Sequence, residues 1–176
     1  MKDLEYWIWF SRIENLSPKK LLELLEKFNE PKEIFNKTKD ELIKYGIKEK
    51  DSEKITKQEY KNNLDKYINY MQKNNIQTIT IKDKYYPEKL KHIYDPPVVL
   101  YLKGNKEILN NISIAIVGCR MCTSYGKEIS KKIAYNLSMN NINVISGLAR
   151  GIDTSSNIGC LNGNAKTIGV MGCRTR

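Results

Sequence analysis

A repeated alternation of short apolar segments with helical segments, over residues 112–171, is the feature that most constrains the fold. Residues 112–117 form a nearly continuous run of apolar residues, typical of a strand buried in a parallel sheet. Residues 143–146 and 167–171 are predicted to be two more strands, and helical spacing of apolar residues follows each of the first two strands. This β-α-β-α-β order predicts half of a doubly wound α/β fold.

The first 74 residues have helical periodicity instead. Ser17 precedes a proline and is predicted to cap a helix, because its hydroxyl can accept a bond from a free backbone N–H. Thr38 and Glu41 have the spacing of a capping box, which predicts another helix start. Residues 52–74 are predicted to form one longer polar helix with a buried apolar face.

Two further strands are predicted between these regions, at residues 76–82 and 98–102. The predicted fold class is therefore α/β, with a small helical domain followed by a Rossmann-like parallel-sheet domain. We place the helical domain at residues 1–74 and the α/β domain at residues 75–176.

Charge is unevenly distributed along the chain. Residues 1–75 contain 16 lysines and arginines against 14 acids, and residues 76–176 contain 14 against 6. The two parts therefore carry +2 and +8 of the total net charge of +10. A polyanionic partner is most plausible for the second part. The alternative is that the excess lysine only solvates the surface.

The cysteines do not form a recognisable metal-site pattern. Cys119 and Cys122 make one C-x-x-C pair, but Cys160 and Cys173 stand alone, and the single histidine, His92, is distant in sequence. A structural zinc site needs a second close pair of ligands. We expect free thiols in a reducing compartment, with no metal and no cofactor.

No apolar run approaches the roughly 18 to 20 residues that span a bilayer. The N-terminus has acids within its short apolar stretch and lacks a small-residue cleavage site, so it is a poor signal peptide. The expected location is cytoplasmic, without membrane association.

Two turns carry the candidate binding chemistry, because ligands bind where the carboxyl ends of parallel strands meet helix N-termini. Glycines there allow close backbone approach, and arginines can pair with phosphate oxygens. We also expect Thr123 or Ser124 to cap the first helix and Asp153 the second. The candidate DNA- or phosphate-binding residues are Gly118, Arg120, Ser124, Ser146, Gly147 and Arg150.

Neither turn matches a known nucleotide-binding fingerprint. The glycine spacing is not G-x-G-x-x-G, and no Gly-Lys-Ser/Thr triplet marks a Walker A loop. The alternative to phosphate binding is that the glycines only serve tight turns between strands and helices.

An ordered series of motifs over residues 76–173 resembles the DNA-processing protein A family, also called DprA or Smf. The series comprises Tyr86-Pro87, Asp95-Pro96-Pro97, Gly118-x-Arg120, Ser146-Gly-Leu-Ala-Arg-Gly-Ile-Asp153 and Thr167-x-x-Val170-x-Gly172. The resemblance implies a Rossmann-like domain that binds single-stranded DNA, and a small helical (SAM-like) domain before it. It further implies loading of the RecA recombinase during natural transformation, possible homodimers and no catalytic activity.

By this resemblance, Arg120 is the best candidate for a DNA contact, and Tyr125 is a candidate to stack on bases or to pack on the sheet. The chain departs from the family at Asn157, where a histidine is usual. It also ends at Arg176, so we expect a Rossmann-like domain that is truncated. Two alternatives stay open: a nucleotide-binding or nucleotide-hydrolysing protein, and an inactive truncated product.

Overall fold

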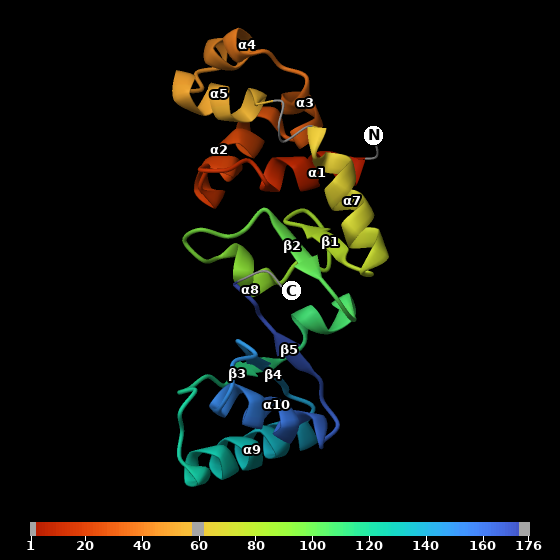
Figure 1. Ribbon diagram of the computed structural model, residues 1–176, viewed down its shortest axis with the longest axis vertical. Coiled ribbons are helices and arrows are strands. Elements are labelled where there is room, and N and C mark those ends of the chain that lie inside the picture. Colours follow the sequence, from red (N-terminus) through yellow and green to blue (C-terminus); the bar gives the residue numbers. More distant parts are fainter. Residues whose placement is uncertain (1–2, 58–61, 173–176) are drawn as a thin grey trace. The chain divides into compact units, whose positions relative to one another are not determined.

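The computed structural model describes residues 3–57 and 62–172 and divides into two compact units, residues 1–106 and 107–176 (Figure 1). Cys173 therefore lies outside the described residues. The α/β fold class is confirmed, with helices leading into a parallel three-stranded sheet. The domain boundary expected after residue 74 stays a prediction. No helix of the described chain is both long enough and apolar enough to cross a membrane.

Helices dominate the first unit up to residue 73, as the sequence predicts. The helices are α1 (Asp3–Ser11), α2 (Pro18–Phe28), α3 (Pro31–Phe35), α4 (Lys39–Lys44), α5 (Glu49–Thr56) and α7 (Leu64–Lys73). Both predicted caps are confirmed. Ser17 Oγ accepts a bond from the backbone N–H of Lys20 at 3.3 Å, and Thr38 and Glu41 form a capping box. Each cap satisfies an N–H group that a helix start leaves without a partner.

The predicted single helix over residues 52–74 is wrong. α5 ends at Thr56, and Lys57 adopts φ −58° and ψ 119°, outside the helical region. The helical periodicity continues nevertheless, because Ile55 in α5 and Leu64 in α7 are both buried. Two separate helices can each turn an apolar face to one core, so a continuous pattern does not require a continuous helix. Residues 58–61 lie outside the described residues.

An apolar core rich in aromatic side chains holds the first unit together. Trp9 and Phe10 of α1 are completely buried. The Trp9 and Phe35 rings pack edge to face, with their centroids 4.9 Å apart. The antiparallel strands β1 (Gln77–Thr80) and β2 (Val99–Leu102) belong to this unit, and Val99 joins the same core. A short helix, α8 (Glu88–Lys91), lies between these strands in sequence.

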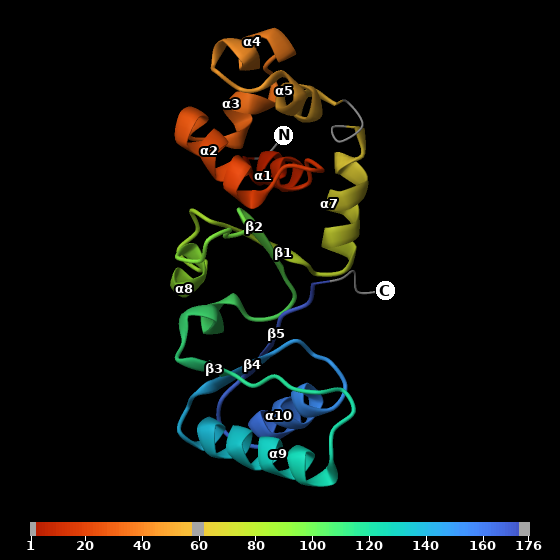
Figure 2. The ribbon, with the colours of Figure 1, turned by 90° about the vertical axis from the view of Figure 1, so that its left-hand side faces the viewer.

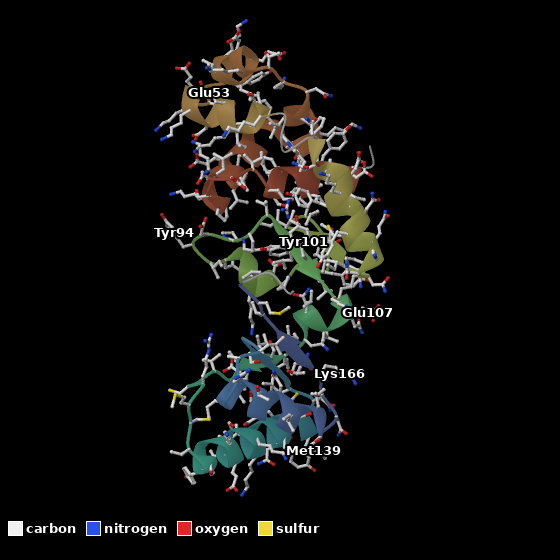
Figure 3. All side chains as sticks on the ribbon, in the orientation of Figure 1. Glu53, Tyr94, Tyr101, Glu107, Met139 and Lys166 are labelled. Atoms are coloured by element: carbon white, nitrogen blue, oxygen red, sulfur yellow. The ribbon has the colours of Figure 1, made fainter. Side chains whose placement is uncertain are left out.

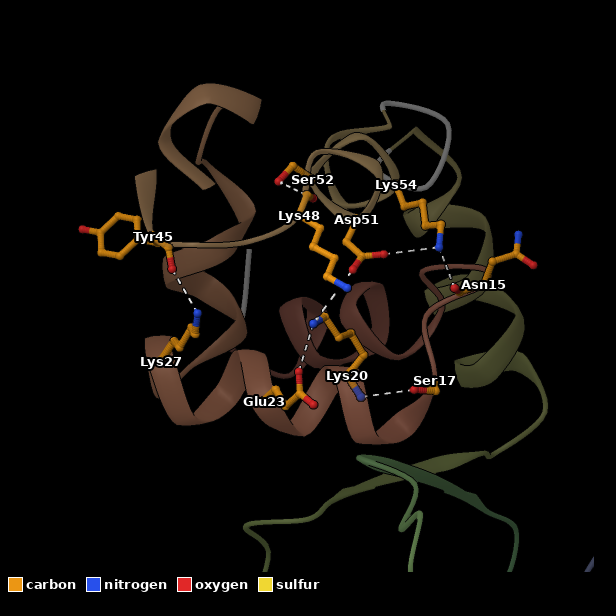
Figure 4. A network of polar contacts seen from close by, with 10 residues as sticks. All are labelled: Asn15, Ser17, Lys20, Glu23, Lys27, Tyr45, Lys48, Asp51, Ser52 and Lys54. Atoms are coloured by element: carbon orange, nitrogen blue, oxygen red, sulfur yellow. Dashed lines mark hydrogen bonds and ion pairs between the residues drawn. The ribbon is translucent and has the colours of Figure 1, made fainter. Parts of the chain in front are cut away.

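Ion pairs connect the outer surfaces of α2 and α5 (Figure 4). Asp51 of α5 forms ion pairs with Lys20 of α2 at 3.9 Å and with Lys54 at 3.4 Å. The ammonium group of Lys54 also donates a hydrogen bond to the backbone carbonyl of Asn15 at 2.8 Å. These side chains are half-buried, and ion pairs near the surface contribute about 0–1 kcal/mol each. Some lysines of this unit therefore already have acidic partners.

The second unit carries the predicted β-α-β-α-β order. After a 3₁₀ helix (Lys106–Asn110), it contains β3 (Ser113–Ala115), α9 (Ser124–Met139), β4 (Asn143–Ser146), α10 (Ile152–Leu161) and β5 (Thr167–Gly169). The strands are parallel in the order β3-β4-β5. Both helices cover the same face of the sheet (Figures 1 and 2). They pack closely, because a side chain at Gly159 of α10 would collide with the backbone carbonyl of Lys131 in α9.

The expectation that residues 112–117 form a buried strand is wrong. β3 is shorter than predicted, and Ile112, Ile114 and Val117 are 72%, 42% and 69% exposed. β3 lies at the edge of the three described strands, and both helices cover a single face. An apolar run is buried on both faces only where layers cover both sides of the sheet.

The interior of the second unit is small and partly polar. Its buried apolar cluster consists of Ala134, Val144, Cys160 and Ala165. Ser138 of α9 is fully buried, donates to the carbonyl of Cys160 at 2.7 Å and accepts from the backbone N–H of Ala165 at 2.8 Å. Hydrogen bonds therefore replace much of the apolar packing that holds the first unit.

Candidate nucleic-acid interface

The two predicted turns lie at one edge of the second unit. Because β3 and β4 are parallel neighbours, the turn after β3 and the turn after β4 emerge at the same end of the sheet. Arg120 and Met121 from the first turn, and Ala149 and Arg150 from the second, line one open hollow. The structure thus brings together two arginines that are 30 positions apart in the sequence.

The second turn packs directly against the first. Gly151 has φ 90°, and a Cβ there would collide with the backbone carbonyls of Cys119 and Arg120. Ile152 donates its backbone N–H to the Cys119 carbonyl at 3.4 Å, and its side chain fills the space beside Gly118. Gly151 and Gly118 are therefore required by close approach of the two turns to each other.

Asp153 connects the two turns through its carboxylate, and it is only 4% exposed. Oδ1 accepts the N–H of Gly118 at 3.1 Å, while Oδ2 accepts those of Gly147 at 3.0 Å and Ala149 at 3.4 Å. The prediction that Asp153 caps α10 is wrong: Gly151 is at the cap, and Asp153 is in the first helical turn. The N–H groups of Gly118 and Gly147, which we expected to face a phosphate, are directed at this carboxylate.

Ser146 lies inside the unit at 2% exposure, away from the surface where we expected it. Asn157 of α10 donates its side-chain amide to Ser146 Oγ at 2.8 Å, and Thr167 of β5 donates to Asn157 Oδ1 at 2.6 Å. Ser146 Oγ also accepts the backbone N–H of Leu148 at 3.2 Å. Asn157 thus links α10 to the two strands β4 and β5.

Leu148 gives the second turn a strained backbone. Its φ of 54° is in the left-handed region, where a residue with a side chain costs on the order of 1–3 kcal/mol. Its side chain lies against Gly169 of β5, where there is no room for a Cβ. The bonds made by Ser146 and Asp153 stabilise this turn against the strain.

The start of α9 presents exposed side chains beside Arg120. Thr123 is the N-cap, because its Oγ1 accepts the backbone N–H of Gly126 at 3.1 Å. This decides between the two predicted caps, and Ser124 is the first, exposed residue of the helix. Tyr125 is 72% exposed and so does not pack on the sheet.

Six positive side chains of this unit form no ion pair with any acid that the structure describes. They are Arg120, Lys127, Lys131, Lys132, Arg150 and Lys166. In the same described part of the chain, no three histidine, cysteine or acidic residues are grouped as metal ligands. The cysteines described, Cys119, Cys122 and Cys160, are free thiols.

A sequence profile described as DNA recombination-mediator protein A matches residues 77–176, which include both turns. The chain belongs to this family. The DNA processing protein DprA of Streptococcus pneumoniae is 40% identical over 95 residues, which are 54% of this chain and 33% of that protein. Protein Smf of Synechocystis is 33% identical over 175 residues, which are 95% of this chain and 43% of that protein.

The fold agrees with this assignment. The X-ray structure of DNA processing protein A (DprA) from Streptococcus pneumoniae matches with a TM-score of 0.64 and 27% identity, covering 98% of this chain and 59% of that one. The chain spans less than half the length of these two curated relatives.

Proposed function

We propose that the edge formed by the two turns binds single-stranded DNA through its phosphates. The observation that carries this proposal is the placement of Arg120 and Arg150 at one hollow, neither paired with a described acid. A guanidinium without an internal partner can pair with two oxygens of a phosphate and release condensed counterions. Such contacts give affinity that depends on salt and little on sequence.

The exposed side chains beside the arginines favour a single strand as the ligand. Tyr125 and Met121 are 72% and 96% exposed in the segment that carries Arg120. Unpaired bases can stack on an exposed aromatic ring, whereas the bases of a duplex are already stacked on each other. Sites for single strands combine such platforms with a positive groove.

Nucleotide binding of the dinucleotide-fold type has less support. In such sites a backbone N–H of the first turn binds the pyrophosphate. Here the N–H of Gly118 is bonded to Asp153. We therefore propose a binding protein and not an enzyme. Release of free base from nucleoside monophosphates by the purified chain would favour the nucleotide-hydrolysing alternative.

The wider role rests on family membership. The matched relatives include DNA processing proteins, so we propose that the chain takes part in DNA recombination during natural transformation. Loading of RecA, assembly into homodimers and a cytoplasmic location are further parts of this proposal.

Arg120→Ala tests the site directly. We expect weaker binding of labelled oligo(dT) in fluorescence anisotropy, with the slope of log K against log salt reduced by about 0.7, because the variant neutralises one phosphate fewer. Lys166→Ala is the matched control, because it also removes one positive charge from this unit. Lys166 precedes β5 (Figure 3), at the amino end of the strand, whereas the two turns follow the carboxyl ends of β3 and β4. Absence of any binding by the unmodified chain at low salt would contradict the proposal.

A further inference from the structure

Asp153 is a buried acid whose position the proposed DNA contacts do not explain. It lies on the same edge as Arg120 and Arg150, yet its oxygens bond to three backbone N–H groups and form an ion pair with neither arginine. A carboxylate is a strong acceptor, so these bonds are stronger than those between neutral groups. An anion that attracts no guanidinium here leaves both arginines free to bind phosphate.

The three N–H groups lie close to the points where the two arginines leave the backbone. Gly118 is two residues before Arg120, and Ala149 is immediately before Arg150. One carboxylate therefore holds both backbones beside the hollow that the arginines line. We infer that Asp153 is a positioning residue that sets the spacing between Arg120 and Arg150, an inference that rests on the proposed single-strand site.

This spacing matters because successive phosphates of one strand are a fixed number of bonds apart. Two arginines on turns that moved independently would bind phosphates separately, and each would have to be ordered on binding. Turns that are already connected present the pair together. The close contact of Gly151 with the first turn acts in the same direction.

Asp153→Asn tests the role with little change in volume. An amide keeps one acceptor oxygen but places an NH₂ where the other oxygen accepted an N–H, so one turn must lose its bond. We expect oligo(dT) affinity to fall roughly tenfold, within the range of couplings between residues of one network. In the Arg120→Ala/Arg150→Ala background the same change should alter affinity by less than about twofold.

The double-mutant cycle separates positioning from general support of the fold. If Asp153 only stabilises the unit, Asp153→Asn weakens binding by the same factor in both backgrounds, and the inference is overturned. Even then, the proposed function still holds if the unmodified chain binds and Arg120→Ala weakens that binding. No binding by the unmodified chain overturns both.

Gly147→Ala provides a second variant that keeps the carboxylate. A Cβ at Gly147 would lie 3.1 Å from Asp153 Oδ2, so the carboxylate must shift by a few tenths of an ångström. We expect a smaller reduction in affinity that again disappears without the arginines. This variant keeps the inference testable if Asp153→Asn unfolds the second unit, which hydrogen exchange of β4 and α10 would reveal.

Discussion

The two units are stabilised by different kinds of interior. In residues 3–106, large side chains such as Trp9, Phe10 and Leu24 form one apolar core, and few polar groups of the described residues are buried there, Ser52 and the Tyr86 hydroxyl among them. In residues 107–172 the buried apolar cluster has four members, whereas the buried polar set is larger. That polar set consists of Ser130, Ser138, Asn143, Ser146, Asp153, Ser156 and Asn157.

The difference extends to the surface charges. Lys39 of the first unit pairs with both Glu49 and Glu53, which raises its pKa, and Asp51 pairs with two further lysines. Arg120 and Arg150 of the second unit have no such partners among the described residues. Ion pairs thus hold part of the lysine charge of the first unit, whereas in the second unit the buried carboxylate of Asp153 bonds to turn amides and not to the arginines beside it.

The largest expected effect is on the apolar core. Leu24→Ala removes a fully buried side chain and should reduce the free energy of unfolding of the first unit by about 2–5 kcal/mol. The fluorescence of Trp7 and Trp9, the only tryptophans, reports this unit during denaturant unfolding. Leu4→Ala, at an exposed position of α1, is the control and should cost much less. An equal decrease of hydrogen-exchange protection in α10 would show that the two units unfold together. The contrast between two separately stabilised units would then be wrong.

A smaller effect is expected in the polar interior. Ser138→Ala leaves the Ala165 N–H and the Cys160 carbonyl without their partner and should cost about 1–3 kcal/mol. Hydrogen exchange of β5 and α10 measures this destabilisation, and tryptophan fluorescence should not change. Ser124→Ala, at an exposed position, serves as the control. A Ser138→Ala variant as stable as the control would mean that this hydrogen bond network does not hold the unit.

The smallest effect concerns a buried polar group of the first unit. Tyr86 donates its hydroxyl to the Pro97 carbonyl at 2.7 Å, and burial raises the pKa of Tyr86 to about 12. Tyr86→Phe should cost about 1 kcal/mol at neutral pH. Because the folded pKa is above the ordinary value of 10, the stability from the neutral phenol is present below pH 10 and is lost as pH rises toward 12.

Unfolding free energies of the unmodified chain and of Tyr86→Phe, measured at several pH values, check this sign. The advantage of the unmodified chain should shrink above pH 10. An advantage that grows there would contradict burial of the neutral phenol. A cost at neutral pH as large as that of Ser138→Ala would weaken the contrast between the two interiors.

Local signals in the sequence predicted much of this protein. The caps at Ser17 and Thr38 each join groups three residues apart, so their short spacing is visible in the sequence. The strand and helix order of residues 112–171 follows from periodicity, and it predicted the parallel sheet. The same order placed Arg120 and Arg150 at one edge, since parallel strands end together.

Only the tertiary structure decided which groups are buried and which groups meet. Gly118 and Asp153 are 35 positions apart, and no local pattern pairs a turn amide with a carboxylate in a later helix. Ser146 and Asn157 likewise meet only because α10 packs back on β4. The sequence by itself determined the elements and their order, because short-range backbone geometry sets them. Burial and bonding partners depend on how the crossovers stack those elements, which is a property of the whole unit.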